Sequence, residues 1–137
     1  MSVADFSGLS TTSAHRIASR VTNVLARLRP RFVKRSSTNE EIRQQQEQFY
    51  RIARFPKIIG CIDCTYCHVK SFGREEAELF RYRKGYLSIN VQAVSNANME
   101  ITDIVARWQG SVHDSTIFNN SRLCETFKQG HYGDAIC

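Results

Sequence analysis

The sequence predicts an α/β protein in which a helical N-terminal region precedes a mixed sheet with flanking helices. Apolar residues recur at spacings of three and four over the first 55 residues, which is typical of amphipathic helices. From Lys57 onward, short apolar runs alternate with polar residues and turns, as strands do. The length of 137 residues and the 42% hydrophobic content fit one soluble domain. We therefore predict a basic helical region over residues 1–55 and a sheet-containing region over residues 56–137.

The first predicted helix covers residues 11 to about 29. Its apolar stripe is formed by Ala14, Ile17, Ala18, Val21, Val24, Leu25 and Leu28. Pro30 is expected to end it, because proline lacks the N–H group and its ring clashes with the preceding turn. The hydroxyl residues after Gly8 suit an N-cap, and the second helix of a helix-turn-helix begins in the same way. Residues 1–55 are thus a candidate for a partial DNA-binding helix-turn-helix.

A second helix is predicted between Thr38 and the helix breaker Pro56. Thr38 and Glu41 have the spacing of a capping box, in which each residue bonds the backbone of the other. A helical stripe of apolar residues follows, formed by Ile42, Phe49, Ile52 and Ala53. The polar, basic residues 31–39 are expected to link the two helices.

The apolar run from Ile58 to Ile62 is rich in β-branched residues and too short for a helix, so we predict a buried central strand that ends at Asp63. The remaining predicted elements are a helical segment over 75–82, an antiparallel hairpin of strands 86–94 and 101–108 around a turn at 96–98, and a partly irregular helix over 114–128.

Positive charge is concentrated at the N-terminus. The formal net charge is +6, and residues 1–35 hold seven of the 19 Lys and Arg residues with Asp5 as the one acid. Such a basic arm suggests an anionic polymer as partner, the alternative being a solvated helix face. A later segment interleaves basic and aromatic residues, which suits phosphate contact and base stacking. The candidate DNA contacts are Arg16, Arg20, Arg29, Arg31, Lys34, Arg35, Arg83 and Lys84.

Two aspartates are candidates for chemistry. Asp63 ends an apolar run, where a carboxylate is costly to bury unless it is paired or binds a cation. Asp114 lies in a short loop after another predicted strand, so it could face the same sheet edge. Two-metal phosphoryl chemistry needs such carboxylates from separate strands, and oxygen ligands favour Mg²⁺ or Mn²⁺. The alternative roles are a strand-end cap for Asp63 and a helix N-cap for Asp114.

One cluster of residues resembles a cofactor site. It consists of Cys61, Cys64, Cys67 and His68. The segment from Cys64 to His68 matches the pattern of haem attachment, which usually belongs to exported proteins, and the first 30 residues lack a secretory signal. If the segment is extended, Cys61 and Cys64 point to opposite faces of the sheet. We expect reduced thiols and an intracellular protein. No apolar run is long enough to cross a membrane.

Three segments, in this order, resemble the PIF/Harbinger transposase superfamily and the domesticated Harbinger transposase-derived nucleases, a resemblance that extends from about residue 8 to the end. They are residues 60–65, 83–94 and 103–115. The resemblance implies an RNase H-like fold of the DDE type, divalent metal at acidic residues, and cutting or joining of DNA strands. By position, Asp63 and Asp114 match metal-binding carboxylates of the family. The resemblance also implies DNA and a Myb-like protein as partners. It implies a location in the nucleus, with the cytoplasm as a second location.

The sequence departs from the family pattern at Cys64 and Tyr66, where many members have glycine and histidine. The family also has a later Gly-Asp pair after an apolar strand, and a helical Glu. Gly133-Asp134 lacks such a strand before it, whereas residues 135–137 resemble the beginning of that strand. We therefore expect a catalytic domain that is truncated in this chain. The predicted function is a metal-dependent DNA nuclease. The alternatives are a domesticated, non-catalytic DNA-binding or protein-interaction module, and a non-functional fragment.

Overall fold

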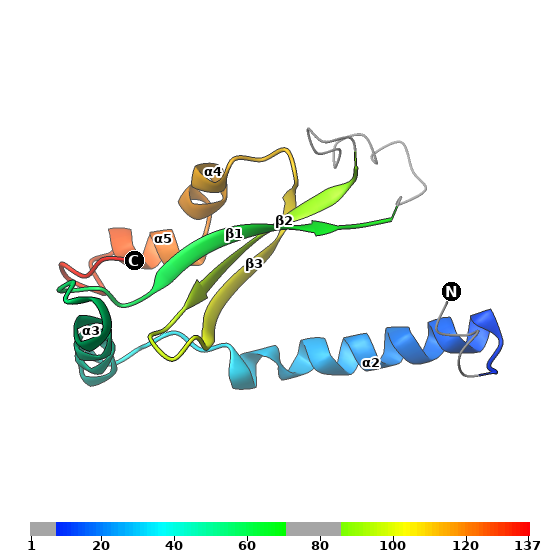
Figure 1. Cartoon of the computed structure of the whole chain (residues 1–137), viewed down its shortest axis with the longest axis horizontal. Coiled ribbons are helices and arrows are strands. Elements are labelled where there is room, and N and C mark those ends of the chain that lie inside the picture. The colour runs from blue at the N-terminus through cyan, green and yellow to red at the C-terminus, as the bar shows by residue number, and fades with distance from the viewer. Residues whose placement is uncertain (1–7, 71–85) are drawn as a thin grey trace. The chain divides into compact units, whose positions relative to one another are not determined.

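The computed structural model describes residues 8–70 and 86–137, and the chain divides into two compact units, residues 1–33 and 34–137. The predicted helical segment over 75–82 and the candidate DNA contacts Arg83 and Lys84 lie outside the described residues. The elements in Figure 1 are α2 Thr11–Phe32, α3 Asn39–Ala53, β1 Cys61–His68, β2 Ser88–Ser95, β3 Ile101–Gln109, α4 Asp114–Asn119 and α5 Arg122–Lys128. The predicted combination of helices with a sheet is confirmed.

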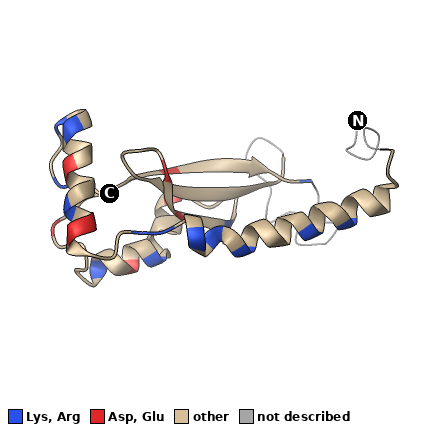
Figure 2. Ribbon diagram, turned by 90° about the horizontal axis from the view of Figure 1, so that it is seen from below, with Lys and Arg blue, Asp and Glu red and all other residues tan. Residues whose placement is uncertain are grey.

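Helix α2 begins where the sequence predicts but runs through Pro30 to Phe32, so the prediction that Pro30 ends it is wrong. Only one backbone bond is missing at a proline, and α2 has no buried residue, so water can reach the carbonyl that is left unpaired. The N–H of Val33 closes the last turn on the Arg29 carbonyl at 2.8 Å. Arginines lie along the helix, which carries no Asp or Glu (Figure 2).

Helix α3 has the predicted capping box. The Thr38 hydroxyl accepts the Glu41 N–H at 3.2 Å, and the Glu41 carboxylate accepts the N–H groups of Thr38 at 3.2 Å and Ser37 at 2.8 Å. These backbone hydrogen bonds hold the pKa of Glu41 below its usual value, and the bond from Ser37 has the largest effect. Ile42 and Phe49 from the predicted stripe are buried. The N-terminus of α3 is therefore firmly fixed.

The described strands form an antiparallel sheet in the order β1-β2-β3. The predicted hairpin of β2 and β3 is confirmed, with its turn closed by the Asn96 N–H on the Glu100 carbonyl at 3.0 Å. Across β1 and β2, Cys64 pairs with Gln92. Because successive residues of a strand face opposite sides, this register decides which side chains can meet.

The prediction of a buried central strand ending at Asp63 is wrong. Strand β1 begins at Cys61, continues to His68, and lies at the edge of the described sheet. Its residues alternate between partly buried and exposed, as expected for a strand that is covered on one face. Asp63 is thus the third residue of β1 rather than its end. The alternation also confirms that Cys61 and Cys64 lie on opposite faces.

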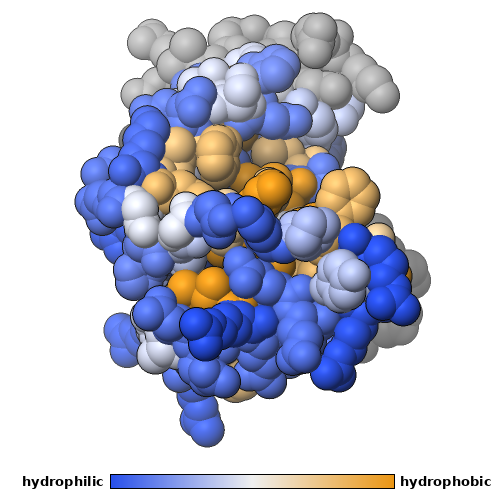
Figure 3. Space-filling view, turned by 90° about the vertical axis from the view of Figure 1, so that its left-hand side faces the viewer, coloured by the Kyte–Doolittle hydropathy of each residue, from blue (hydrophilic) through white to orange (hydrophobic). Residues whose placement is uncertain are grey.

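The core of the second unit lies where α3, β2 and α5 meet. Its buried members are Ile42, Ile59, Val94, Leu123 and Tyr132. The irregular helix predicted over 114–128 forms as two short helices, α4 and α5. Seen from the side on which α3 lies in Figure 1, hydrophobic side chains reach the surface between hydrophilic ones (Figure 3). In the described part of the chain, no helix is long and apolar enough to span a membrane.

Ile136 forms a parallel bridge with Ile58, just before β1. The Ile59 N–H donates to the Ile136 carbonyl at 2.9 Å, and the Ile136 N–H donates to the Lys57 carbonyl at 2.8 Å. The bridge shows that Ile136 is paired as in a strand, and the prediction that residues 135–137 begin a longer strand stays a prediction. In contrast, Asp134 lies in the preceding turn and forms a salt bridge with Lys57.

Candidate active site

Asp114 is the first residue of α4. The N-cap is His113, whose ring nitrogen Nδ1 accepts the Ser115 N–H at 3.3 Å, so the alternative cap role considered for Asp114 belongs to its neighbour. The Asp114 Oδ1 atom accepts a hydrogen bond from the side-chain Nδ2 of Asn90 at 2.8 Å. The same Nδ2 also donates to the Val112 carbonyl at 3.1 Å. One amide therefore holds both the carboxylate and the loop that leads to it.

Asn90 belongs to a band of buried polar side chains on β2. Ser88, Asn90 and Gln92 are each at most 1% exposed and, two residues apart, share one face of the strand. The Asn90 Oδ1 and both polar side-chain atoms of Gln92 have no hydrogen-bond partner among the described residues. An unpaired buried polar group costs about 1–3 kcal/mol, so this band is not an ordinary core.

A glycine allows the Asp114 loop to pass close to this band. A Cβ atom at Gly110 would lie 1.9 Å from the Ser88 hydroxyl and 3.0 Å from the Ser88 carbonyl. The Gly110 N–H donates to that carbonyl at 2.8 Å, which ties the loop to β2. Any side chain at Gly110 would push the loop away from the strand.

Cys64 connects the two predicted aspartates. Its backbone N–H donates to the Asp63 Oδ1 at 2.8 Å, and its thiol forms a hydrogen bond with the Asp114 carboxylate. Burial raises the pKa of this thiol to about 11, and the negative charges of Asp114 and Asp63 add to the effect. At neutral pH the thiol is therefore a neutral donor, and it experiences the charge of both carboxylates.

Asp63 and Asp114 differ in their surroundings. The Asp63 side chain is exposed and lies against the backbone of its own strand through the bond to Cys64. The Asp114 carboxylate is held from two sides, by Cys64 and by Asn90. Both aspartates lie next to Cys64 although they are far apart in the sequence.

Hard oxygen donors of this kind suit Mg²⁺ or Mn²⁺. Within the described ranges, no group of three or more His, Cys, Asp or Glu side chains could hold a metal ion. Two carboxylates fit the way Mg²⁺ is often held, with waters and substrate phosphates completing the shell. Asp63 and Asp114 can therefore supply only part of the ligand shell of such an ion.

The candidate DNA contacts divide between the two units. Arg16, Arg20, Arg29 and Arg31 lie on α2, and Lys34 and Arg35 begin the second unit. Arg35 donates to the Thr126 hydroxyl at 3.3 Å, so part of its donor capacity is used within the fold.

Sequence reasoning missed Asn90 and Gln92 as site residues. Both lie in a segment that carries the family resemblance, and a signal was present. On the buried face of β2, the first three alternate positions, Ser88, Asn90 and Gln92, are polar, and Val94 follows as a core residue. A strand whose buried face is polar indicates a site rather than a core.

Comparison with known proteins supports the resemblance. Residues 62–136 match the family model described as DDE superfamily endonuclease. HARBI1 of Homo sapiens, described as a candidate nuclease, is 26% identical over 131 residues, which are 96% of this chain and 37% of that protein. HARBI1 of Rattus norvegicus is 27% identical over 92% of this chain and 36% of its own length. The chain thus spans little more than a third of these relatives. No solved structure matches it.

Proposed function

Because the chain belongs to the DDE superfamily endonuclease family, we propose that it is part of a divalent-metal-dependent DNA nuclease in which Asp63 and Asp114 are metal ligands. The observation that supports this proposal is that Cys64 contacts both aspartates, Asp63 through its backbone N–H and Asp114 through its thiol. We also propose DNA as substrate, a Myb-like protein as partner and a nuclear location.

The protein groups have distinct roles in this proposal. Asp63 and Asp114 supply oxygen ligands, and Asn90 holds Asp114 in place. A bound Mg²⁺ or Mn²⁺ would activate the attacking water or hydroxyl and stabilise the leaving oxygen. The basic residues of α2 would hold the DNA backbone by phosphate contacts that do not depend on sequence.

The finer parts of the fold prediction belong to the same proposal. We propose an RNase H-like arrangement for residues 56–137, supported by the antiparallel order β1-β2-β3 and by the parallel bridge between Ile58 and Ile136 next to β1. For residues 1–55 we propose part of a helix-turn-helix, supported by the basic helix α2 with its exposed apolar stripe.

A calorimetric Mn²⁺ titration tests the metal site. We expect weak binding by the 137-residue chain and loss of binding in both Asp63→Asn and Asp114→Asn. Asp134→Asn is the matched control, because this carboxylate is exposed and bonded to Lys57 away from Cys64. If both site variants bind Mn²⁺ as the control does, the metal assignment is wrong.

One observation favours the second candidate function, a non-catalytic DNA-binding or interaction module. The Cys64 thiol hydrogen-bonds the Asp114 carboxylate, and burial of this thiol disfavours its ionised form. Cys64→Gly, which restores the residue of many family members, distinguishes the two functions. A nuclease site should gain Mn²⁺ affinity when the competing thiol is removed, whereas a module without a metal site should show no change.

A further inference from the structure

The side-chain amide of Gln92 is buried without a partner. The residue is 1% exposed, and neither its Nε2 nor its Oε1 atom has a hydrogen-bond partner among the described residues. An amide has two donor hydrogens and an acceptor oxygen, so its burial with none of them bonded is costly to the fold. Proteins accept such a cost mainly at functional sites.

Gln92 lies next to both groups that hold the Asp114 carboxylate. It is the cross-strand partner of Cys64 in the pairing of β1 with β2, and it follows Asn90 by two residues on the same face of β2. Residues directly opposite each other in an antiparallel pair have Cβ atoms about 4.5–5.5 Å apart. The long side chain of Gln92 can therefore bring its carbonyl oxygen to the Cys64 thiol.

The Cys64 thiol donates its hydrogen bond to the Asp114 carboxylate, which also accepts the bond from Asn90. Both bonds use the oxygen atoms with which Asp114 would bind a cation. A thiol has a single S–H donor, which is left without an acceptor if the carboxylate turns to a cation. The unpaired Oε1 atom of Gln92 is an alternative acceptor on the same face of the sheet.

We propose that Gln92 is a positioning residue that accepts the Cys64 S–H group when the Asp114 carboxylate binds a divalent cation. The hydrogen bond of the thiol moves from the carboxylate to the Gln92 Oε1 atom, and no proton is transferred. Asp114 then loses a competing donor and keeps the bond from Asn90, which orients it. The role in metal binding rests on the proposed function, whereas the exchange of acceptors can be measured without metal.

Infrared spectroscopy of the metal-free protein tests the exchange, because the S–H stretching band moves to lower frequency when a thiol donates a hydrogen bond. The band of Cys64 is isolated by subtracting the spectrum of Cys64→Ala. In Asp114→Ala the band should stay at low frequency, because Gln92 accepts the bond. In Asp114→Ala with Gln92→Leu it should rise to the frequency of an unbonded thiol. A band that Gln92→Leu does not move in this background would show another acceptor, such as water, and would overturn the proposal.

Calorimetric Mn²⁺ titration tests the role in metal binding. Gln92→Leu should bind Mn²⁺ about tenfold more weakly than wild type, as expected when a group behind a metal ligand is lost. The same substitution in a Cys64→Gly background should have no effect, because no thiol remains to be accepted. An equal loss in both backgrounds, or a loss in neither, contradicts the proposal. If Asp63→Asn and Asp114→Asn also leave Mn²⁺ binding unchanged, the metal assignment itself fails, and the infrared result still decides the exchange of acceptors.

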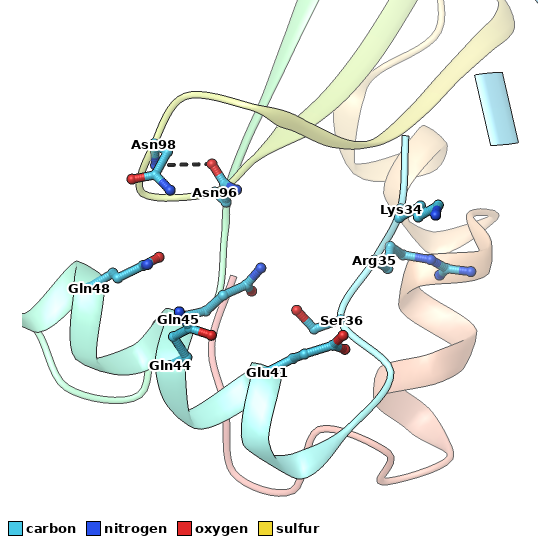
Figure 4. A pocket seen from close by; sticks show the side chains of 9 residues that line it. All are labelled: Lys34, Arg35, Ser36, Glu41, Gln44, Gln45, Gln48, Asn96 and Asn98. Carbon is cyan, nitrogen blue, oxygen red and sulfur yellow. Dashed lines mark hydrogen bonds between the residues drawn. The ribbon is translucent and has the colours of Figure 1, made fainter. Parts of the chain in front are cut away.

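Urea unfolding separates this role from a structural one. Leucine is apolar and similar in size to glutamine, so Gln92→Leu should raise the unfolding midpoint while it weakens Mn²⁺ binding. A lower midpoint would mean that the amide holds the fold together and would count against the proposal. Gln45→Leu is the matched control, because Gln45 is a partly buried glutamine of α3 that lines a polar cleft beside the β2–β3 turn, outside the polar band of β2 (Figure 4). The control should leave the S–H band and the Mn²⁺ affinity unchanged.

Discussion

The side-chain Nδ2 of Asn90 donates to Oδ1 of Asp114 at 2.8 Å, which links the middle of β2 to the start of α4. Asn90 is fully buried, and its second bond, to the Val112 carbonyl, fixes the loop as well. Asn90 is therefore a positioning residue for the proposed metal ligand Asp114.

Asn90→Ala is expected to weaken Mn²⁺ binding by about 10–100-fold, the usual effect of removing a group that orients a metal ligand. Asn90→Asp keeps the shape but places a second carboxylate against Asp114, so its Mn²⁺ affinity should depend more steeply on pH. Asn120→Ala is the control, because Asn120 also donates a side-chain bond, to the Thr116 carbonyl, but not to Asp114. Calorimetry that gives equal affinities for Asn90→Ala and the control would contradict the positioning role.

The Cys64 thiol should react slowly with iodoacetamide at mildly alkaline pH. Its pKa is raised to about 11, mainly by burial, and only the thiolate is nucleophilic. Asp114→Asn removes a negative charge and so lowers this pKa, which should make alkylation of Cys64 faster, while burial keeps the pKa above its usual value. Peptide mass spectrometry can follow Cys64 beside the exposed Cys67, whose rate should stay constant. An unchanged Cys64 rate would argue against the contact with Asp114.

The capping box of α3 should contribute measurable stability. Thr38→Ala is expected to cost about 1 kcal/mol in the free energy of unfolding, as for other substitutions that remove an N-cap. The pKa of Glu41 is lowered in the folded state, so its contribution is present above the unfolded value of 4.5 and is lost as pH falls through the lower folded value. Urea unfolding should show Glu41→Gln destabilised at neutral pH and similar to wild type in strong acid. Glu40→Gln, outside the box, should show no such pH dependence.

The arginines of α2 should make duplex DNA binding depend on salt. Replacing Arg16, Arg20 and Arg31 with glutamine should lower the slope of log affinity against log salt by up to about 0.9 for each phosphate that the helix no longer neutralises. A filter-binding titration measures the slope, and Arg51→Gln is the control because Arg51 is paired with Glu47 on α3. An identical slope for the triple variant and the control would rule out α2 as a DNA-binding element.

Local patterns allowed most elements to be predicted. The capping box at Thr38 and Glu41 and the β2–β3 hairpin depend on residues close in sequence, and both formed as expected. The sequence could not show that α2 continues past Pro30, because this depends on whether water reaches the unpaired carbonyl. The edge position of β1 depends on the order of strands, which a single apolar run does not determine.

The candidate site shows the same limit. Asp63 and Asp114 could be selected from their sequence neighbours and from a family resemblance, but their relation depends on pairing between distant segments. The register that sets Cys64 opposite Gln92 brings the β2 side chains to the same face. The alternate polar residues of β2 can be interpreted as part of the site only when this register is known. Asn90 then contacts the Asp114 loop.

The parallel bridge between Ile58 and Ile136 has a consequence for the order of folding. The hairpin of β2 and β3 closes over a short turn, whereas the bridge joins two segments that are far apart in the sequence, with the whole sheet between them, and requires a larger loss of chain entropy. The bridge should therefore form late and open first. In hydrogen exchange, the amides of Ile59 and Ile136 should exchange with solvent earlier than those at the centre of β2, although all of them are hydrogen-bonded.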